Sequence, residues 1–178
     1  MVEMTIASAV SGFGAKVKAK LASAAISGAP EDQLRGPLET LIHDLAAING
    51  LSHGAVNLIG ETTLSHLKIR PDYAVSVNNG LAGFIEVKAP GKGSDPRKFA
   101  DPHDKAQWVK LKSLPNLLYT DGNGFSLWRN GELAAKPALF EGDIETAGGK
   151  LGAPSNLLAL IADFLLWKPE APKTAKRH

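Results

Sequence analysis

Asp72, Glu86 and Lys88 are residue types that together could carry out hydrolysis. Asp72 follows Pro71, and Glu86 and Lys88 come fourteen and sixteen residues later in the tripeptide Glu-Val-Lys. Two neighbouring carboxylates suit a hard divalent cation such as Mg²⁺, which keeps several waters for substrate phosphates. A nearby ammonium could orient or deprotonate an attacking water and neutralise charge on a phosphate in the transition state. The alternative is a surface ion pair, either Glu86 with Lys88 or Asp72 with Arg70, which stabilises a protein little.

Two apolar runs, residues 73–77 and 81–87, flank Asn78-Asn79-Gly80 and predict a β-hairpin around these charges. The length of the hairpin loop decides which charged residues share a face, because side chains alternate across a strand. A two-residue turn at the last two loop residues would place Asp72 and Glu86 on opposite faces. We favour a three-residue loop with its glycine in the left-handed conformation, which places Asp72 across from Glu86. A two-residue loop would give that grouping only with a β-bulge.

The favoured register also separates apolar from charged side chains. The charged face would gather Asp72, Glu86 and Lys88. The opposite, apolar face would hold Tyr73, Val75, Val77, Ile85 and Val87. A structural domain with accidental motif residues predicts instead that Asp72 and Glu86 lie on opposite faces of the sheet. The placement of these two carboxylates therefore distinguishes the two hypotheses.

A helix is predicted over about residues 30–49, because leucines and isoleucines recur at helical spacing and Gly50 ends the pattern. Pro37 lies beyond its first turn and is expected to kink it. The helix offers two candidates for a third carboxylate at the site. Glu31 lies roughly 35° from the centre of the apolar stripe, and Glu39 roughly 115° from it. Glu31 is better aimed inward, although an acid in the first turn also stabilises the helix dipole.

The further predicted elements are an N-terminal helix over about 3–27, a strand at 55–59, a helix from Asp101-Pro102 to about 113, a hairpin at 116–129 and an apolar helix at 155–167. Glu61, after the first strand, is an exposed loop acid that could approach the site. The segments are predicted to form an N-terminal helical segment (1–28), which is a peripheral helix or an arm, a main domain (29–167) and a tail or linker (168–178).

Positive charge gathers between Lys88 and Lys112, although the whole chain has a net charge of only +2. This block holds seven cations and three anions. It begins at the proposed site, where a phosphate backbone would have to approach. The block therefore suggests a nucleic-acid partner, and a solvated charged face is the alternative.

Composition excludes several other kinds of site. The chain has no cysteine, which rules out disulfides and thiolate metal sites. Its five histidines are scattered, so neither a zinc site nor a Ser-His-Asp triad is indicated. No apolar run reaches the length of a transmembrane helix, and no signal peptide is recognisable. We expect a cytoplasmic protein without a membrane partner.

Pro71-Asp72 followed by Glu86-Val87-Lys88 resembles the signature of the PD-(D/E)xK nucleases. The wider sequence resembles the N-terminal nuclease domain of restriction-modification enzymes in which nuclease and N6-adenine methylase share one polypeptide. The resemblance covers most of residues 31–134. It is carried by EDQLR, RPDYAV, GFIEVKAPGKG, HDKAQWVKLKSLPNLLYTDG and FSLWRNGEL, in that order.

The resemblance implies a restriction-endonuclease-like α/β core, with a mixed central sheet flanked by helices, that hydrolyses DNA with Mg²⁺ or, as a substitute, Mn²⁺. Asp72, Glu86 and the backbone carbonyl of Val87 would hold the metal, and Lys88 would activate water. Further implied site residues are Glu31 and Gln107, which would support the metal site, and Arg35, which completes the family's Glu-x-x-x-Arg spacing with Glu31. Arg35 and three cations of the basic block, Lys92, Arg97 and Lys98, are expected to bind DNA. Some relatives have a tyrosine four residues after this glutamine, where the present chain has Leu111.

The resemblance also implies partners outside residues 29–167, namely adenine-methylase and target-recognition domains in the same or an associated polypeptide. No NPPY-type methylase motif occurs in the chain. A second hypothesis is a non-catalytic DNA-binding or docking module of a DNA methyltransferase that retains the nuclease fold.

Overall fold

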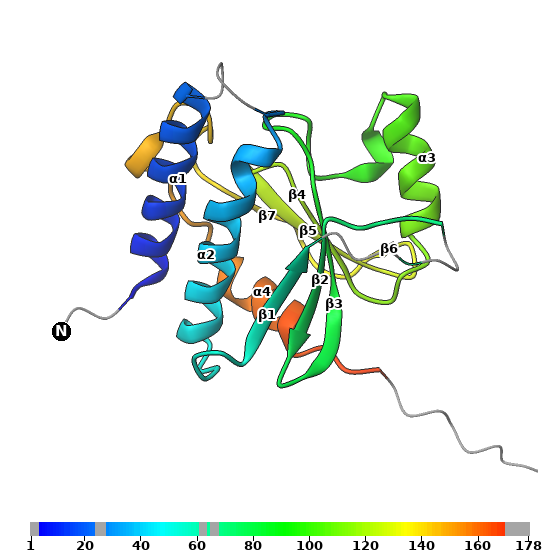
Figure 1. Cartoon of the computed structure of the whole chain (residues 1–178). Coiled ribbons are helices and arrows are strands. Elements are labelled where there is room, and N and C mark those ends of the chain that lie inside the picture. Colours follow the sequence, from blue (N-terminus) through cyan, green and yellow to red (C-terminus); the bar gives the residue numbers. More distant parts are fainter. Residues whose placement is uncertain (1–3, 24–27, 61–63, 65–67, 170–178) are drawn as a thin grey trace, which may run out of the picture.

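The computed structural model describes residues 4–23, 28–60, 64 and 68–169. Its centre is a seven-stranded sheet in the order β1-β2-β3-β4-β5-β6, with β7 paired to β5 (Figure 1). The strands are β1 (Val56–Gly60), β2 (Tyr73–Val77), β3 (Gly80–Val87), β4 (Leu117–Thr120), β5 (Gly124–Arg129), β6 (Glu132–Leu133) and β7 (Ala138–Leu139). Of the pairings between these strands, β3 with β4 is parallel and the others are antiparallel. The predicted mixed sheet is confirmed.

Helix α3 (Pro102–Leu111) lies in the connection between the parallel strands β3 and β4. Parallel neighbours need such a crossover, because a tight turn can join only antiparallel strands. Asp101 caps the helix, and its side chain accepts hydrogen bonds from the main-chain N–H groups of His103 and Asp104. The helix thus begins where the Asp-Pro pair predicts. Its side chains contact Lys88, the residue directly after β3.

The β2–β3 loop differs from the predicted three-residue loop. Val77 pairs with Gly80, so the turn consists of Asn78 and Asn79, which both adopt left-handed conformations with φ of 51° and 68°. Asparagine tolerates this conformation better than most residues, which allows a two-residue hairpin turn here. The pairing then shifts through a β-bulge, and Tyr73 pairs with Ile85. The bulge restores the predicted grouping of charged side chains by the route that a two-residue loop requires.

Gly83 follows the bulge at a point of close approach. A Cβ atom there would lie 2.5 Å from the Asn116 carbonyl oxygen and 2.7 Å from a ring carbon of Phe164. Asn116 precedes β4, and Phe164 belongs to α4 (Leu157–Leu165). Only glycine lets these three segments meet at this distance.

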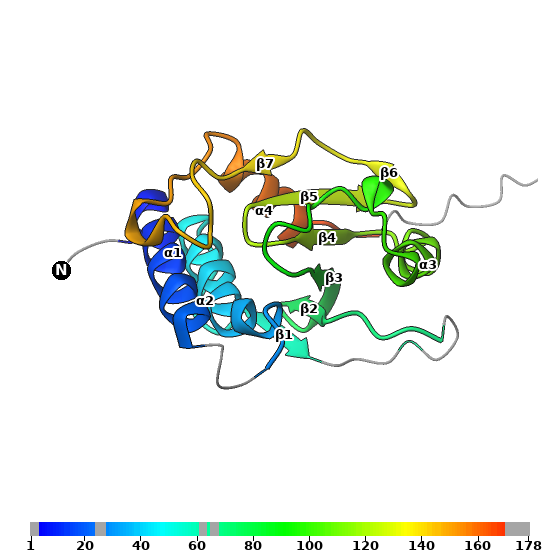
Figure 2. The ribbon, with the colours of Figure 1, turned by 90° about the horizontal axis from the view of Figure 1, so that it is seen from above.

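Helices cover both faces of the sheet (Figures 1 and 2). Helices α1 (Ile6–Ser23), α2 (Asp32–Ile48) and α4 pack on one face around the larger apolar cluster, and α3 lies on the other with a smaller cluster. Tyr73, Val75, Ile85 and Val87 belong to the larger cluster, and Val77 packs against it, as predicted for the apolar face of the hairpin.

Helix α1 contributes to the same apolar cluster as the rest of this face. Its Val10, Phe13 and Val17 are buried there beside α2. Pro37 lies inside α2 and is itself buried. No helix among the described residues is long and apolar enough to cross a membrane. Most of the predicted tail, from residue 170 onward, lies outside the described residues.

Candidate active site

Asp72 and Glu86 lie together at the ends of β2 and β3. The Asp72 main-chain N–H donates to Glu86 Oε1 over 3.2 Å, and the Val87 N–H donates to Asp72 Oδ2 over 2.7 Å. These two reciprocal bonds hold the carboxylates on one side of the hairpin. The arrangement contradicts the opposite-face placement expected of accidental motif residues.

Glu86 is deeply buried, with 3% of its surface exposed, whereas the Asp72 side chain is 27% exposed. Burial raises the pKa of Glu86 to about 8, because it penalises the charged carboxylate. The neighbouring negative charge of Asp72 adds to this increase, and the positive charge of Lys88 opposes it. Glu86 Oε2 lies 3.4 Å from Lys88 Nζ. This carboxylate therefore lacks enough positive charge to remain fully ionised at neutral pH.

Lys88 is also buried, with 5% exposure, and its ammonium is held from helix α3. It donates to Asp104 Oδ1 over 3.0 Å and to Gln107 Oε1. The two residues lie three positions apart and so share one face of the helix. The structure thus brings the predicted Gln107 to Lys88.

Asp104 is a site residue that sequence reasoning missed, because it was counted only as an anion within the basic block. Its second oxygen lies 2.8 Å from Lys92 Nζ. Burial by itself raises the pKa of Asp104, but the hydrogen bonds from Lys92 and Lys88 outweigh burial and hold that pKa below its usual value. Its spacing from Gln107 on the helix was the available signal.

Arg35 lies behind the carboxylate pair. Its guanidinium donates to Asp72 Oδ1 over 3.0 Å and to the Asp72 main-chain carbonyl over 3.1 Å, and it stacks over the Tyr73 ring at 4.7 Å. A bidentate contact of this kind fixes the Asp72 side chain and its strand end. Arg35 therefore has an internal partner, whereas the sequence suggests a role in DNA binding.

Of the three other predicted DNA-binding cations, Arg97 and Lys92 pair with aspartates, and Lys98 lies in a different hollow. Arg97 pairs with Asp95 over 2.9 Å and lies above the Trp128 ring, 4.9 Å from its centroid. Lys92 is exposed and paired with Asp104, as described above. Lys98 lines a separate hollow that also includes Trp128. Their contact with DNA stays a prediction.

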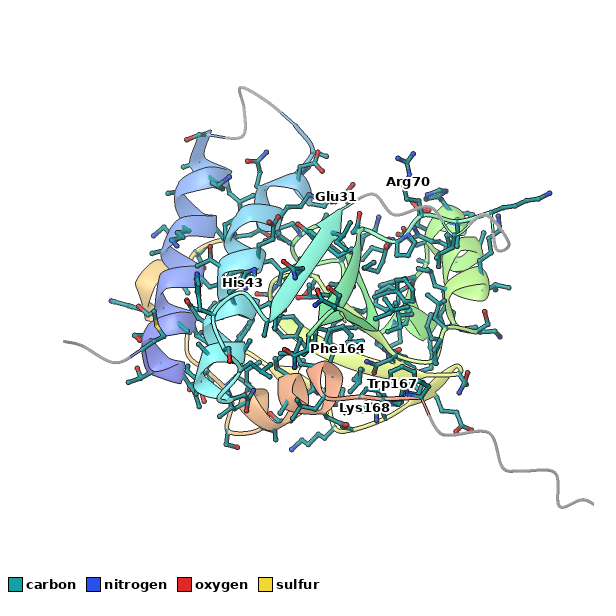
Figure 3. All side chains as sticks on the ribbon, turned by 60° about the horizontal axis from the view of Figure 1, so that its bottom comes forward. Glu31, His43, Arg70, Phe164, Trp167 and Lys168 are labelled. Carbon is teal, nitrogen blue, oxygen red and sulfur yellow. The ribbon has the colours of Figure 1, made fainter. Side chains whose placement is uncertain are left out.

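The candidate third carboxylates have different surroundings. Glu31 occupies the N-cap position of α2 without a capping hydrogen bond from its side chain. It is exposed and lines the same cleft as the carboxylate pair; Figure 3 shows it at the end of the helix. Glu39 instead accepts a hydrogen bond from the Tyr73 hydroxyl over 2.7 Å. Glu61 lies outside the described residues. Within the described part of the chain, no three acidic or histidine side chains are clustered closely enough to bind a metal together.

These groups line one polar cleft of about 280 Å³ between the hairpin, α2 and α3. Its lining includes the predicted residues Glu31, Asp72, Glu86, Val87, Lys88, Lys92 and Gln107, together with Asp32, Asp101, His103 and Asp104. The arrangement can offer carboxylate oxygens to a cation and an ammonium to a phosphate on the same side of the sheet.

No protein-family model matches the sequence, and no curated protein sequence is significantly similar to it. Among solved structures, the chain resembles part of a cryo-electron-microscopy structure of a DrdV–DNA complex, with a TM-score of 0.60 and 20% sequence identity. The match covers 92% of this chain but only 14% of that chain. At the level of the fold, the predicted restriction-endonuclease-like α/β core is confirmed.

Proposed function

We propose that the chain is a Mg²⁺-dependent nuclease domain of the PD-(D/E)xK type, which hydrolyses phosphodiester bonds in DNA. The observation that carries the proposal is the reciprocally bonded pair Asp72 and Glu86, with the buried Lys88 ammonium 3.4 Å from Glu86. Burying the Glu86 carboxylate beside a second acid costs stability, so its presence favours a functional role. The fold similarity to part of a DNA-bound protein supports DNA as the substrate.

The donor groups in the cleft fit a hard cation. Asp72 and Glu86 supply carboxylate oxygens, and Val87, whose carbonyl we propose as a third oxygen ligand, lines the same cleft. Burial raises the pKa of Glu86, the negative charge of Asp72 adds to this increase, and Lys88 offsets it only in part, so a bound cation would stabilise the charged carboxylate. When bound, Mg²⁺ would polarise the phosphate and make a bound water more acidic. Glu31, which lines the same cleft, would contact a water bound to the metal.

The remaining residues of the site would position the reacting groups and neutralise negative charge on the phosphate. Lys88 would orient the attacking water and offset negative charge on the phosphate. Gln107 and Asp104 would fix the Lys88 amine from α3, and Arg35 would fix Asp72 from α2. A site whose side chains are held in place by neighbouring protein groups in this way is pre-organised before the substrate binds.

We further propose that this domain works within a larger cytoplasmic restriction-modification enzyme. The chain corresponds to only 14% of the DNA-bound chain it resembles. Adenine-methylase and target-recognition domains in the same or an associated polypeptide would then supply methylation and sequence recognition.

A second candidate is a non-catalytic DNA-binding or docking module. Every carboxylate oxygen of the pair already has a protein partner: Asp72 is bonded to Arg35 and Val87, and Glu86 to the Asp72 N–H and Lys88. A module without metal would need nothing more at this position. Metal dependence separates the two candidates.

The deciding experiment measures DNA cleavage with Mg²⁺ or Mn²⁺, using the chain alone and within its parent enzyme. Lys88→Ala should lower the cleavage rate by about 10²–10⁴-fold, the usual contribution of a general acid–base group. Lys112→Ala, at the exposed C-terminal end of α3, is the matched control and should cleave normally. Cleavage by Lys88→Ala at the unmodified rate would refute the assignment. DNA binding that is indifferent to metal and to Asp72→Asn, without cleavage, would favour the binding module.

A further inference from the structure

A second hollow adjoins the active-site cleft on the outer side of α3. This hollow, which we call the basic groove, runs between the segment 68–70 and α3 and has a volume of about 270 Å³. It is lined by Lys68, Ile69, Arg70, His103, Ala106, Gln107 and Lys110. His103 and Gln107 line both hollows, so the basic groove continues directly into the cleft that contains Asp72 and Glu86.

The basic groove carries three cations and no acid. Lys68, Arg70 and Lys110 are exposed and line it, and no aspartate or glutamate does. None of these three has an ion pair with another described residue. Figure 3 shows the Arg70 side chain projecting outward on the α3 side of the molecule. The charges are therefore available to an outside anion.

The cations nearer the cleft behave differently. Arg35, Lys92 and Arg97 each pair with an aspartate of the same chain. An external phosphate would have to compete with these carboxylates. The three cations of the basic groove, by contrast, have no such partner among the described residues, and they lie beside the residues for which the sequence predicts DNA contact.

Three of the groove residues form one row along α3. His103, Gln107 and Lys110 recur every three or four positions, and such residues lie on one face of a helix. Lys110 lies about 4.5 Å farther along the helix axis than Gln107. Gln107 in turn contacts Lys88. The row therefore leads from the groove to the proposed catalytic ammonium.

We propose that the basic groove binds the phosphate backbone of duplex DNA next to the phosphate that enters the cleft. Arg70 and Lys110 are the principal contacts, with Lys68 at the outer side. The groove would set the path of the strand to be cut and so align it with Lys88. This inference extends the proposed nuclease function and rests on it, because that function is the reason for taking DNA as the ligand.

The test measures binding of the full chain to a fluorescent DNA duplex by anisotropy, in EDTA and across a series of salt concentrations. Binding without metal separates this proposal from the proposed catalysis. The double variant Arg70→Gln/Lys110→Gln should weaken binding about tenfold or more near 0.1 M salt. It should also reduce the steepness of the salt dependence by nearly 2, because each lost phosphate contact removes about 0.9 from the slope of log affinity against log salt.

The matched control is Lys136→Gln/Lys150→Gln, which removes two exposed lysines outside both hollows and outside the basic block of residues 88–112. It should leave affinity and salt slope near those of the unmodified chain. Equal losses in both double variants would overturn the proposal, because the charge effect would then be diffuse. Absence of duplex binding by the unmodified chain would also overturn it. If the groove variant behaves as expected but the unmodified chain does not cleave DNA with Mg²⁺ or Mn²⁺, the proposed nuclease function fails and the proposed DNA-binding groove is retained.

Discussion

The two faces of the β2–β3 hairpin are both buried but are stabilised in different ways. On one face, Tyr73, Val75, Ile85 and Val87 join an apolar cluster with the helices α1, α2 and α4. Near the ends of the strands on the other, Glu86 and Lys88 are buried charges that depend on Asp72 and on α3 for partners. The difference suggests that the apolar face supplies the stability with which the charged face is held in place.

The largest effect should come from breaking the apolar face. Ile85 is fully buried, with 0% exposure, so Ile85→Ala should lower the free energy of unfolding by about 2–5 kcal/mol. Leu81, on the same strand but 57% exposed, is the control, and its replacement by alanine should change stability by less than about 1 kcal/mol. Urea unfolding of the two variants measures both values. Similar losses would show that the apolar face is not the main source of stability.

On the charged face, Glu86→Gln should increase the free energy of unfolding above neutral pH, whereas Ile85→Ala lowers it. The folded-state pKa of Glu86 is raised from 4.5 to about 8, so the folded state binds more protons than the unfolded state in this range. Stability conferred by this group is therefore complete below about pH 4.5 and is lost as pH rises towards 8. At pH 8, the free energy of unfolding of Glu86→Gln should be roughly 1–3 kcal/mol higher than that of the unmodified chain.

The stability measurement needs unfolding curves at several pH values. Near pH 4 the two proteins should be equally stable, because Glu86 is then protonated and neutral like glutamine. A variant that is less stable than the unmodified chain throughout would show that Glu86 contributes net favourable pairing with Lys88.

Metal binding should show the reverse pH dependence. A proton on Glu86 competes with a cation, so Mn²⁺ affinity should increase by up to about tenfold per pH unit below the raised pKa. It should level off above about pH 8. Calorimetric titration of Mn²⁺ at several pH values measures this, with Glu86→Gln as a weak and pH-independent comparison. Affinity that does not vary between pH 6 and 8 would argue against Glu86 as a ligand.

The smallest effect concerns how the charged face is positioned. Asp104→Asn removes the carboxylate that contacts Lys88 Nζ and Lys92 Nζ, so cleavage should slow by about tenfold. Mn²⁺ affinity should stay the same, because Asp104 has no contact with Asp72 or Glu86. Asp163→Asn, which removes the exposed partner of Arg129, is the control for loss of an ion pair. If Mn²⁺ affinity fell together with the rate, Asp104 would act on the whole site.

Most elements were predictable because their signals are local. The Asp101-Pro102 cap, the apolar runs of β2 and β3 and the periodic apolar stripe of α2 are each formed by residues that are close together in the chain. The hairpin loop was predicted with the wrong length, since the sequence Asn-Asn-Gly is compatible with two turn types. The bulge beyond it is set by packing, because Gly83 must admit Asn116 and Phe164 from distant segments.

The sequence by itself determined the fold class and the motif residues Asp72, Glu86 and Lys88, together with the helix that carries Gln107. Only the tertiary structure decided which groups hold them: Arg35 reaches Asp72 across 37 residues, and Asp104 reaches Lys88 across 16. It also placed Lys68, Arg70 and Lys110, three cations without an ion pair to another described residue, in one groove beside the cleft. The physical reason is that backbone preferences act between near neighbours, whereas the partner of a buried charge depends on how α2 and α3 pack against the sheet.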